Sequence, residues 1–499
     1  MAVSIEGEHA FRITAEGLVE LARRLTSAKL VEARPSKAPS TPQPSVHAYS
    51  QAMEKGVHHL PIVYHNAYVE PLKKQIERVV IETTKMGGSD PAETLVGAVS
   101  DHAPDSGVAR PLRRFSVVIA DLYRSFLEKE KRLGSRIPLA EALPPLATFR
   151  PDCSMGPYTY ESDVVHSIIG SEVGVVSLPS SYRNHPLLWG LLAHETGGHD
   201  VLHADRWLLP ELGAGAAALL NSWAPYFGPS AGAASLLGML WQYWMDESAA
   251  DIYGILNLGP AFALNLTAWL AALRAEAGLP LPTLMLSPAV APDGTLDNHP
   301  PDILRLHLAI GGIGSLTALN PVLRQAYIGL LVELAELAAG DRDTVSIQGH
   351  LPLHGRSKVP VQVEMPLALM QFSATLVGSY IAAVPLHALG GNTIQQIETW
   401  DDLDEMIAYR MAEGLRNKAC PYQLGDPAHL LAGATLACVA DPSSYNSITT
   451  ELEKGLDIAA EGDPLWGRLV PRASSAGPLG GQFQIAKPEP PKHKLASAG

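Results

Sequence analysis

The sequence predicts a mainly α-helical protein with a small β-sheet, in which an α+β core is flanked by helical regions. Apolar residues recur at helical spacing along most of the chain, and the C-terminal third shows this pattern almost throughout. One short β-branched run, Glu172–Pro179, interrupts the helical pattern in the middle third. With 499 residues and a hydrophobic fraction of 46%, the chain is long enough to bury a sizeable core.

The amino-acid composition indicates which binding partners and which cellular compartment to expect. The 37 basic and 51 acidic side chains give a net charge of −14, which argues against nucleic acid or an anionic membrane as the main partner. The 3 cysteines are far apart and odd in number, so no disulfide framework is expected. The N-terminus lacks an apolar targeting segment. We therefore expect a reduced, cytoplasmic protein, and no pattern in the sequence indicates its oligomeric state.

Four regions are expected along the chain. The first is a helical N-terminal region at 1–150, which contains a proline-rich linker at 35–44. A core at 151–315 follows, then a helical region at 316–486. The Pro/Lys/Ser-rich stretch at 487–499 is expected to be a disordered tail.

The N-terminal region is expected to be built from helices with one long connection. A polar stretch rich in Gly, Asp and Pro, at 87–110, predicts a loop. Amphipathic periodicity predicts helices at Phe11–Ala33, Pro71–Met86 and Pro111–Leu133.

The core is expected to contain one strand and two long helices. The run Glu172–Pro179 reads as an edge strand because a proline ends it. Asn184 and the following His-Pro then start an apolar helix at Leu187–Leu202. A second helix carries Trp244 and ends near Leu256.

The C-terminal region reads almost entirely as helices. The apolar stretch Pro366–Leu389 contains Gln371, Ser373 and Pro385, which favour a buried helix over a membrane span. Helices are predicted at Pro321–Ala339, Pro366–Ala383, Asp402–Asn417, Pro427–Ala440 and Ser447–Ala460.

A His-Glu motif on the first core helix points to metal chemistry. Zinc is bound by neutral imidazoles and carboxylates, and a catalytic zinc keeps one position open for water. The sequence His194-Glu195-Thr-Gly-Gly-His199 supplies two imidazoles, with Glu195 as a base for that water. The two histidines are five positions apart, which on a regular α-helix would separate them by about 140°. His203 lies four positions after His199, and the sequence leaves open whether it is a metal ligand, a residue that supports a ligand, or a core residue.

The glycine pair inside this motif predicts a local distortion. Each glycine costs about 1 kcal/mol relative to alanine inside a helix, so two in succession need a structural reason. A wide turn of the π type would absorb one extra residue and bring both histidines to one face. We therefore expect a π-bulge at Gly197 and Gly198.

Two later segments supply further polar groups. Glu247 and Asp251 are four positions apart on the second core helix, so they lie on one face among small residues. Glu247 is a candidate metal ligand, and Asp251 is a candidate partner for the free N–H of a ligating histidine. The segment Asp297–His307 contains His299 before two prolines and Arg305 in the following helical turns, which are candidates for stabilising an oxyanion.

Together these three segments resemble the zinc metallopeptidases called gluzincins. Their order along the chain is similar to that of peptidases of the HtpX and CAAX-protease type, although the membrane helices of those proteins are not evident here. The five-residue histidine spacing is similar to that of dipeptidyl peptidase III. The resemblance extends roughly over 172–307, and the flanking regions resemble no family.

The resemblance implies a zincin-like catalytic core and a role for each motif residue. It implies His194, His199 and Glu247 as Zn²⁺ ligands and Glu195 as the general base. It further implies Asp251 as the residue that orients a histidine, and His299 and Arg305 as transition-state stabilisers. No tyrosine is placed by a motif, so Tyr158, Tyr160 and Tyr243 stay candidates.

Three interpretations of the function follow from these residues, and the first is that the protein is a peptidase. The substrate would be a peptide, which the strand Val173–Leu178 could bind in extended form, or a small molecule. A second reading is a non-peptidase metalloenzyme, because two histidines and one carboxylate also form the Fe²⁺ site of non-haem oxygenases. A third is a non-catalytic helical scaffold with a degenerate metal site. Glu195 favours a hydrolase, since an oxygenase needs no base beside its first ligand.

Overall fold

The computed structural model describes residues 2–5, 11–27, 44–86, 91–127, 142–150, 157–227, 232–352 and 358–467. Within these ranges the protein is mainly helical with small β-sheets, which confirms the predicted fold class at this level. The predicted linker at 35–44, apart from Pro44, and the predicted tail at 487–499 lie outside the described residues.

The described N-terminal residues begin with a two-stranded sheet rather than a helix. Strand β1 (Ala2–Ile5) pairs in antiparallel fashion with β2 (Phe11–Thr14), and helix α1 (Ala15–Thr26) follows. The helix predicted from Phe11 therefore begins at Ala15, where the hydroxyl of Thr14 accepts a hydrogen bond from the backbone N–H of Gly17. Helix α1 packs against α10 (Pro260–Glu276) and α16 (Pro427–Ala440).

Four further helices precede the central sheet. The loop predicted at 87–110 is wrong in part, because the 10 residues of α4 lie within it. Pro91 stands in its first turn, and Leu95, Val96 and Val99 form a buried face at helical spacing. The four helices are α2 (Val46–Val57), α3 (Glu70–Met86), α4 (Pro91–Ser100) and α5 (Ala109–Leu127).

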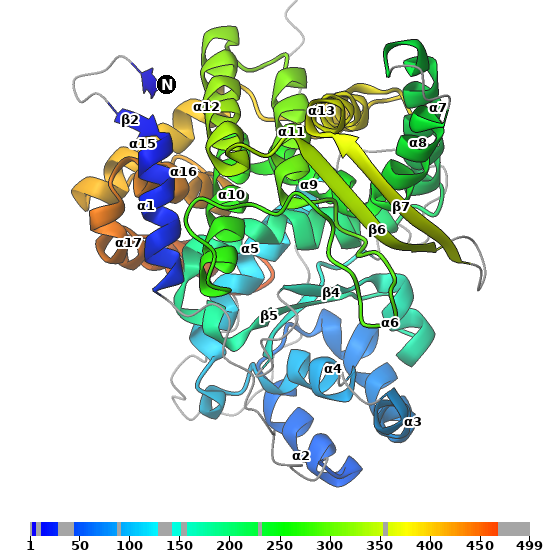
Figure 1. The fold of residues 1–499 in the computed structure, drawn as a ribbon. Coiled ribbons are helices and arrows are strands. Elements are labelled where there is room, and N and C mark those ends of the chain that lie inside the picture. The colour runs from blue at the N-terminus through cyan, green and yellow to red at the C-terminus, as the bar shows by residue number, and fades with distance from the viewer. Residues whose placement is uncertain are drawn as a thin grey trace, which may run out of the picture.

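A three-stranded sheet lies between α2, α3 and α4 on one side and the rest of the protein, which includes α5, on the other (Figure 1). Its order is β3 (Leu146–Arg150), β5 (Val175–Pro179), β4 (Tyr158–Tyr160), with β5 parallel to β3 and antiparallel to β4. Every residue of β5 is buried. The predicted edge strand is therefore the central strand, and its continuous apolar run is typical of a strand covered on both faces. The edge beside the functional site belongs to β4.

The core helices are more broken than the sequence predicts. The expected helix at Leu187–Leu202 consists of a 3₁₀-helix, η5 (Pro186–Leu191), and a π-helix, η6 (Ala193–Val201). The expected second helix is two helices, α8 (Ala233–Tyr243) and α9 (Met245–Leu258), which meet at Trp244. Three other helices complete this part: α6 (Ser162–Ile169), α7 (Leu208–Ser222) and α11 (Asp302–Ser315).

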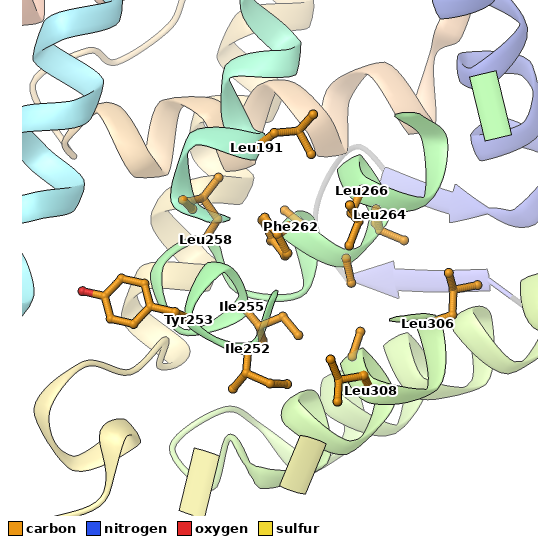
Figure 2. Close-up of a cluster of buried hydrophobic side chains, with 14 of the residues drawn as sticks. Leu191, Ile252, Tyr253, Ile255, Leu258, Phe262, Leu264, Leu266, Leu306 and Leu308 are labelled. Atoms are coloured by element: carbon orange, nitrogen blue, oxygen red, sulfur yellow. The ribbon is translucent and has the colours of Figure 1, made fainter. Parts of the chain in front are cut away.

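The main buried cluster joins helices from distant parts of the chain. Figure 2 shows Leu191 of η5, Ile255 and Leu258 of α9 and Leu308 of α11 around Phe262 of α10. A Cβ atom on Gly254 would lie 2.5 Å from the ring of Phe262, so a glycine is needed for this contact. The cluster extends into all three large predicted regions. The boundaries at 150, 315 and 486 stay a prediction.

The C-terminal region contains the predicted helices and a hairpin that the prediction missed. Strands β6 (Thr344–Pro352) and β7 (Lys358–Pro366) pair in register from Thr344 with Pro366 to Pro352 with Lys358. Buried and exposed residues alternate along both, as expected for a sheet with one covered face. The helices are α12 (Pro321–Ala339), α13 (Leu367–Ala383), α14 (Ile394–Ile397), α15 (Asp402–Asn417), α16 and α17 (Tyr445–Gly462).

One segment among the described residues, Leu367–Leu389, is long and apolar enough to cross a membrane. Its first part, α13, packs closely against α11: a Cβ atom on Gly378 would lie 2.1 Å from the carbonyl oxygen of Leu308. Its polar side chains also bond to other helices, since Ser373 accepts a hydrogen bond from the indole N–H of Trp241. These contacts pack one side of α13 against other helices, which is consistent with the predicted lack of a membrane span.

Candidate metal centre

His194 and His199 lie on η6, whose backbone is a π-helix. In a π-helix the hydrogen bonds join residues five apart, so the two imidazoles lie on the same face. Their Nε2 atoms are 3.2 Å apart, and the rings meet edge to face. The wide turn predicted at this motif is confirmed, and it extends over the nine residues Ala193–Val201.

Gly197 and Gly198 also allow α9 to approach η6 closely. A Cβ atom on Gly197 would lie 2.0 Å from the ring of Tyr253, and one on Gly198 would lie 2.1 Å from Cβ of Ala250. Any larger residue would push the two helices apart. The glycine pair therefore serves helix packing as well as the wide turn.

Helix α9 brings its carboxylates against the two histidines. Asp246 and Glu247 lie in its first turn, where the helix dipole favours negative charge. Oε2 of Glu247 lies 3.1 Å from Nε2 of His194 and 3.5 Å from Nε2 of His199. His194, His199 and Glu247 thus form a group that could hold a metal ion, and we call these three residues the inner cluster.

The inner cluster has dimensions that suit zinc. A tetrahedral zinc ion with ligands at about 2.1 Å has neighbouring ligand atoms about 3.4 Å apart. The three separations within the cluster are 3.1, 3.2 and 3.5 Å. Iron and other divalent transition metals accept the same donor set, so the geometry fits a class of metals and does not identify one.

Each imidazole of the inner cluster has a carboxylate at its other nitrogen. Nδ1 of His194 lies 2.8 Å from Oδ1 of Asp251, and Nδ1 of His199 lies 3.3 Å from Oδ1 of Asp246. An ionised carboxylate only accepts hydrogen bonds, so Nδ1 of each ring is the donor to its carboxylate, and a bound metal ion would take the place of any proton at Nε2. This is the arrangement in which a histidine binds a metal through Nε2.

Arg305 lies behind Asp251 rather than on the face of the inner cluster. Its Nε and Nη2 atoms donate to the two oxygens of Asp251, both at 2.7 Å, and both side chains are buried. Burial alone would raise the pKa of Asp251, but Arg305 and His194 hold it at about 2. The charged carboxylate then fixes the ring of His194, and this position gives Arg305 a positioning role.

The loop before α11 contacts Glu247 with two side chains. The amide of Asn298 donates to Oε1 of Glu247 at 2.8 Å, and Nε2 of His299 lies 3.1 Å from Oε2. Although burial disfavours the charged ring, Glu247 and Asp297 raise the pKa of His299 to about 9. Burial opposes ionisation of Glu247 as well, yet the charges of His299 and His199 bring its pKa well below the usual range.

Glu195 and Tyr158 lie on the side of the site that faces β4. The Thr159 hydroxyl is 2.9 Å from Oε2 of Glu195, so a residue of the edge strand holds this buried carboxylate. Burial and the charges of Glu161 and Glu195 raise the pKa of Tyr158, against the influence of Arg150 and His199. Tyr158 is partly exposed beside the site, whereas Tyr160 is buried and the hydroxyl of Tyr243 donates to the backbone of Leu296.

A pocket of about 610 Å³ adjoins the site at Asp246. Its wall includes Leu209 of α7, Met239 of α8 and Leu351 at the end of β6. The lining is mostly apolar, and Asp246 joins it to the inner cluster through His199.

The structure therefore brings together the residues that the motifs indicated and adds others. His194, His199 and Glu247 converge, the buried Glu195 follows His194 on η6 and contacts Thr159, and Asp251 bonds to His194. Sequence reasoning missed Asp246 and Asn298, which precede Glu247 and His299 in the chain and carry no spacing signal of their own. Comparison with protein-family models, curated proteins and solved structures found no match to the chain.

Proposed function

We propose that the protein is a zinc-dependent hydrolase that cleaves peptide bonds. The observation that carries this proposal is the convergence of two imidazole Nε2 atoms and one carboxylate within 3.5 Å of one another, with Glu195 next to the first imidazole in the chain. Two histidines and one acid leave a position for water at a tetrahedral zinc, which is typical of catalytic rather than structural sites.

The residues of the site suit hydrolysis by an activated water. Bound zinc lowers the pKa of its water to near neutrality and polarises a carbonyl group. Glu195 would take the proton of the attacking water and pass it to the leaving amine nitrogen as the C–N bond breaks. The Thr159 hydroxyl, 2.9 Å from Oε2, fixes the Glu195 carboxylate for this transfer. Tyr158, which is partly exposed beside the site, and His299, whose Nε2 lies 3.1 Å from Oε2 of Glu247, are the candidates to stabilise the oxyanion.

Strand β4 supports a peptide as the substrate. The pairing predicted for Val173–Leu178 is wrong, because β5 already pairs with β3 on one side and β4 on the other. Among the described residues β4 pairs as a strand only with β5, so an extended peptide would add at its other edge. Thr159 lies on this strand and contacts Glu195, so a peptide bound along β4 would run close to the base.

The pocket beside Asp246 supports a preference for one kind of amino-acid side chain in the substrate peptide. A volume of about 610 Å³ and a mostly apolar lining would accept a large apolar side chain next to the cleaved bond. An acidic side chain there would lose its hydration without a described basic partner in the lining.

A peptide library tests this function directly. We expect protein loaded with zinc to generate new peptide ends with large apolar residues enriched at one position, as read by mass spectrometry. Protein stripped by a chelator should leave the library intact, and added zinc should restore cleavage. A zinc-loaded protein that leaves every peptide intact would contradict the peptidase proposal, and would direct attention to other hydrolyses.

A further inference from the structure

A second group of possible metal ligands lies on the outer side of His199. It contains Glu161, His203 and Asp246, with Nδ1 of His199 alongside, and one atom from each lies within 4.8 Å of the others. We call Glu161, His203 and Asp246 the outer cluster. The three come from the start of α6, the end of η6 and the start of α9, so tertiary packing rather than sequence proximity brings them together.

The contacts of Asp246 place it between the two clusters. Its Oδ1 atom lies 2.8 Å from Nε2 of His203 and 3.3 Å from Nδ1 of His199. Because Nε2 of His199 faces the inner cluster, Nδ1 of that ring is the hydrogen-bond donor to Asp246. The candidate ligand atoms on the outer side are therefore those of Glu161, His203 and Asp246.

Glu161 is released for this role by an unusual helix cap. It occupies the cap position of α6, yet its side chain makes no capping hydrogen bond. The carboxylate of Asp200 on η6 accepts the backbone N–H of Ser162 instead, at 2.9 Å. Gly174 leaves room for this contact, since a Cβ atom there would lie 2.5 Å from Oδ1 of Asp200. Glu161 thus faces the histidines while another residue caps its helix.

The geometry points to a second divalent transition-metal site, formed by Glu161, His203 and Asp246. Two carboxylates and one imidazole suit zinc or manganese, and bringing two carboxylates together is unfavourable unless a cation or proton lies between them. The imidazole ring of His199 stands between the two clusters, so the two ions would not share a water. The outer ion would be coordinated by Asp246 and would therefore change the strength of the hydrogen bond between this carboxylate and Nδ1 of His199.

Metal stoichiometry tests this site without any assay of activity. The chain is stripped with a chelator, dialysed against excess Zn²⁺ or Mn²⁺, and its metal content is measured by elemental analysis. We expect two zinc ions per chain in the wild type and one in Glu161→Gln, which removes an outer ligand but no contact to the inner cluster. Glu247→Ala should also retain one ion, and the double variant none.

A matched control is Glu172→Gln, which changes an exposed carboxylate that pairs with His166 outside both clusters. It should bind two ions, as the wild type does. One zinc ion in the wild type that Glu161→Gln retains, or two in Glu161→Gln, would overturn the outer site. The outer site stands if Glu247→Ala keeps one ion that Glu161→Gln with Glu247→Ala loses, even where peptide cleavage is never observed.

Discussion

Replacing Glu195 with glutamine should slow peptide cleavage by about 10²–10⁴-fold while leaving the metal content unchanged. Glutamine has the shape of glutamate and can still bond to the Thr159 hydroxyl, but it cannot accept a proton from water. Single-turnover rates on a peptide found in the library, together with elemental analysis, measure both quantities on the same preparation.

Glu405→Gln is a suitable control for this experiment. Glu405 is also buried, and it accepts hydrogen bonds from the Tyr327 hydroxyl and the indole N–H of Trp400 rather than from the region of the inner cluster. Its replacement should leave the cleavage rate within a few-fold of the wild type. A Glu195→Gln variant that cleaves as fast as the wild type would show that another group takes the proton.

Replacing Arg305 with methionine should have the largest effect on stability. The change leaves the carboxylate of Asp251 buried without its cationic partner, which typically costs about 3–5 kcal/mol. Asp251 also fixes the ring of His194, so zinc affinity should fall by about 10–100-fold. Denaturant unfolding of the zinc-free protein and competition with a chromophoric chelator measure the two effects separately.

Two further variants make the interpretation specific. Arg305→Lys keeps the charge but loses the paired hydrogen bonds. It should therefore fold, and it should lose less stability and less zinc affinity than Arg305→Met. Arg274 makes the same two-bond contact with Asp302, at 2.6 and 2.8 Å, but reaches no histidine. Arg274→Met should lower stability and leave zinc affinity unchanged. Equal zinc affinity in Arg305→Met and the wild type would contradict the positioning role of Arg305.

The metal motif could be read from the sequence because the chemistry and the spacing agree. Two histidines five positions apart required a wide turn, and the adjacent Gly197 and Gly198 indicated where it would lie. Glu247 and Asp251 were recognisable as a pair on one helix face. The long C-terminal helices were also predictable from their apolar periodicity, and in α12, α13 and α16 a proline at or just before the first residue marks the start.

Other features depend on packing that no local pattern contains. Strand β5 ends in a proline and reads as an edge, but β3 and β4 cover both its sides. Buried and exposed residues alternate along β6 and β7, but both strands are short and lie within the region 316–486 that the sequence predicted to be helical. The role of Asp246 depends on the orientation of the His199 ring, whose Nδ1 atom points toward the Asp246 carboxylate. The place of Arg305 behind Asp251 likewise depends on how α11 packs on α9.

The metal content of the purified protein tests the central claim most directly. The protein is prepared without chelator, alongside Glu247→Ala and the control Glu336→Ala, which alters an exposed carboxylate on α12. We predict that the wild type and Glu336→Ala contain the same amount of zinc, and that Glu247→Ala contains one ion fewer per chain. Iron in place of zinc would favour an oxygenase, and a wild type without stoichiometric metal would contradict the inner cluster as a metal centre.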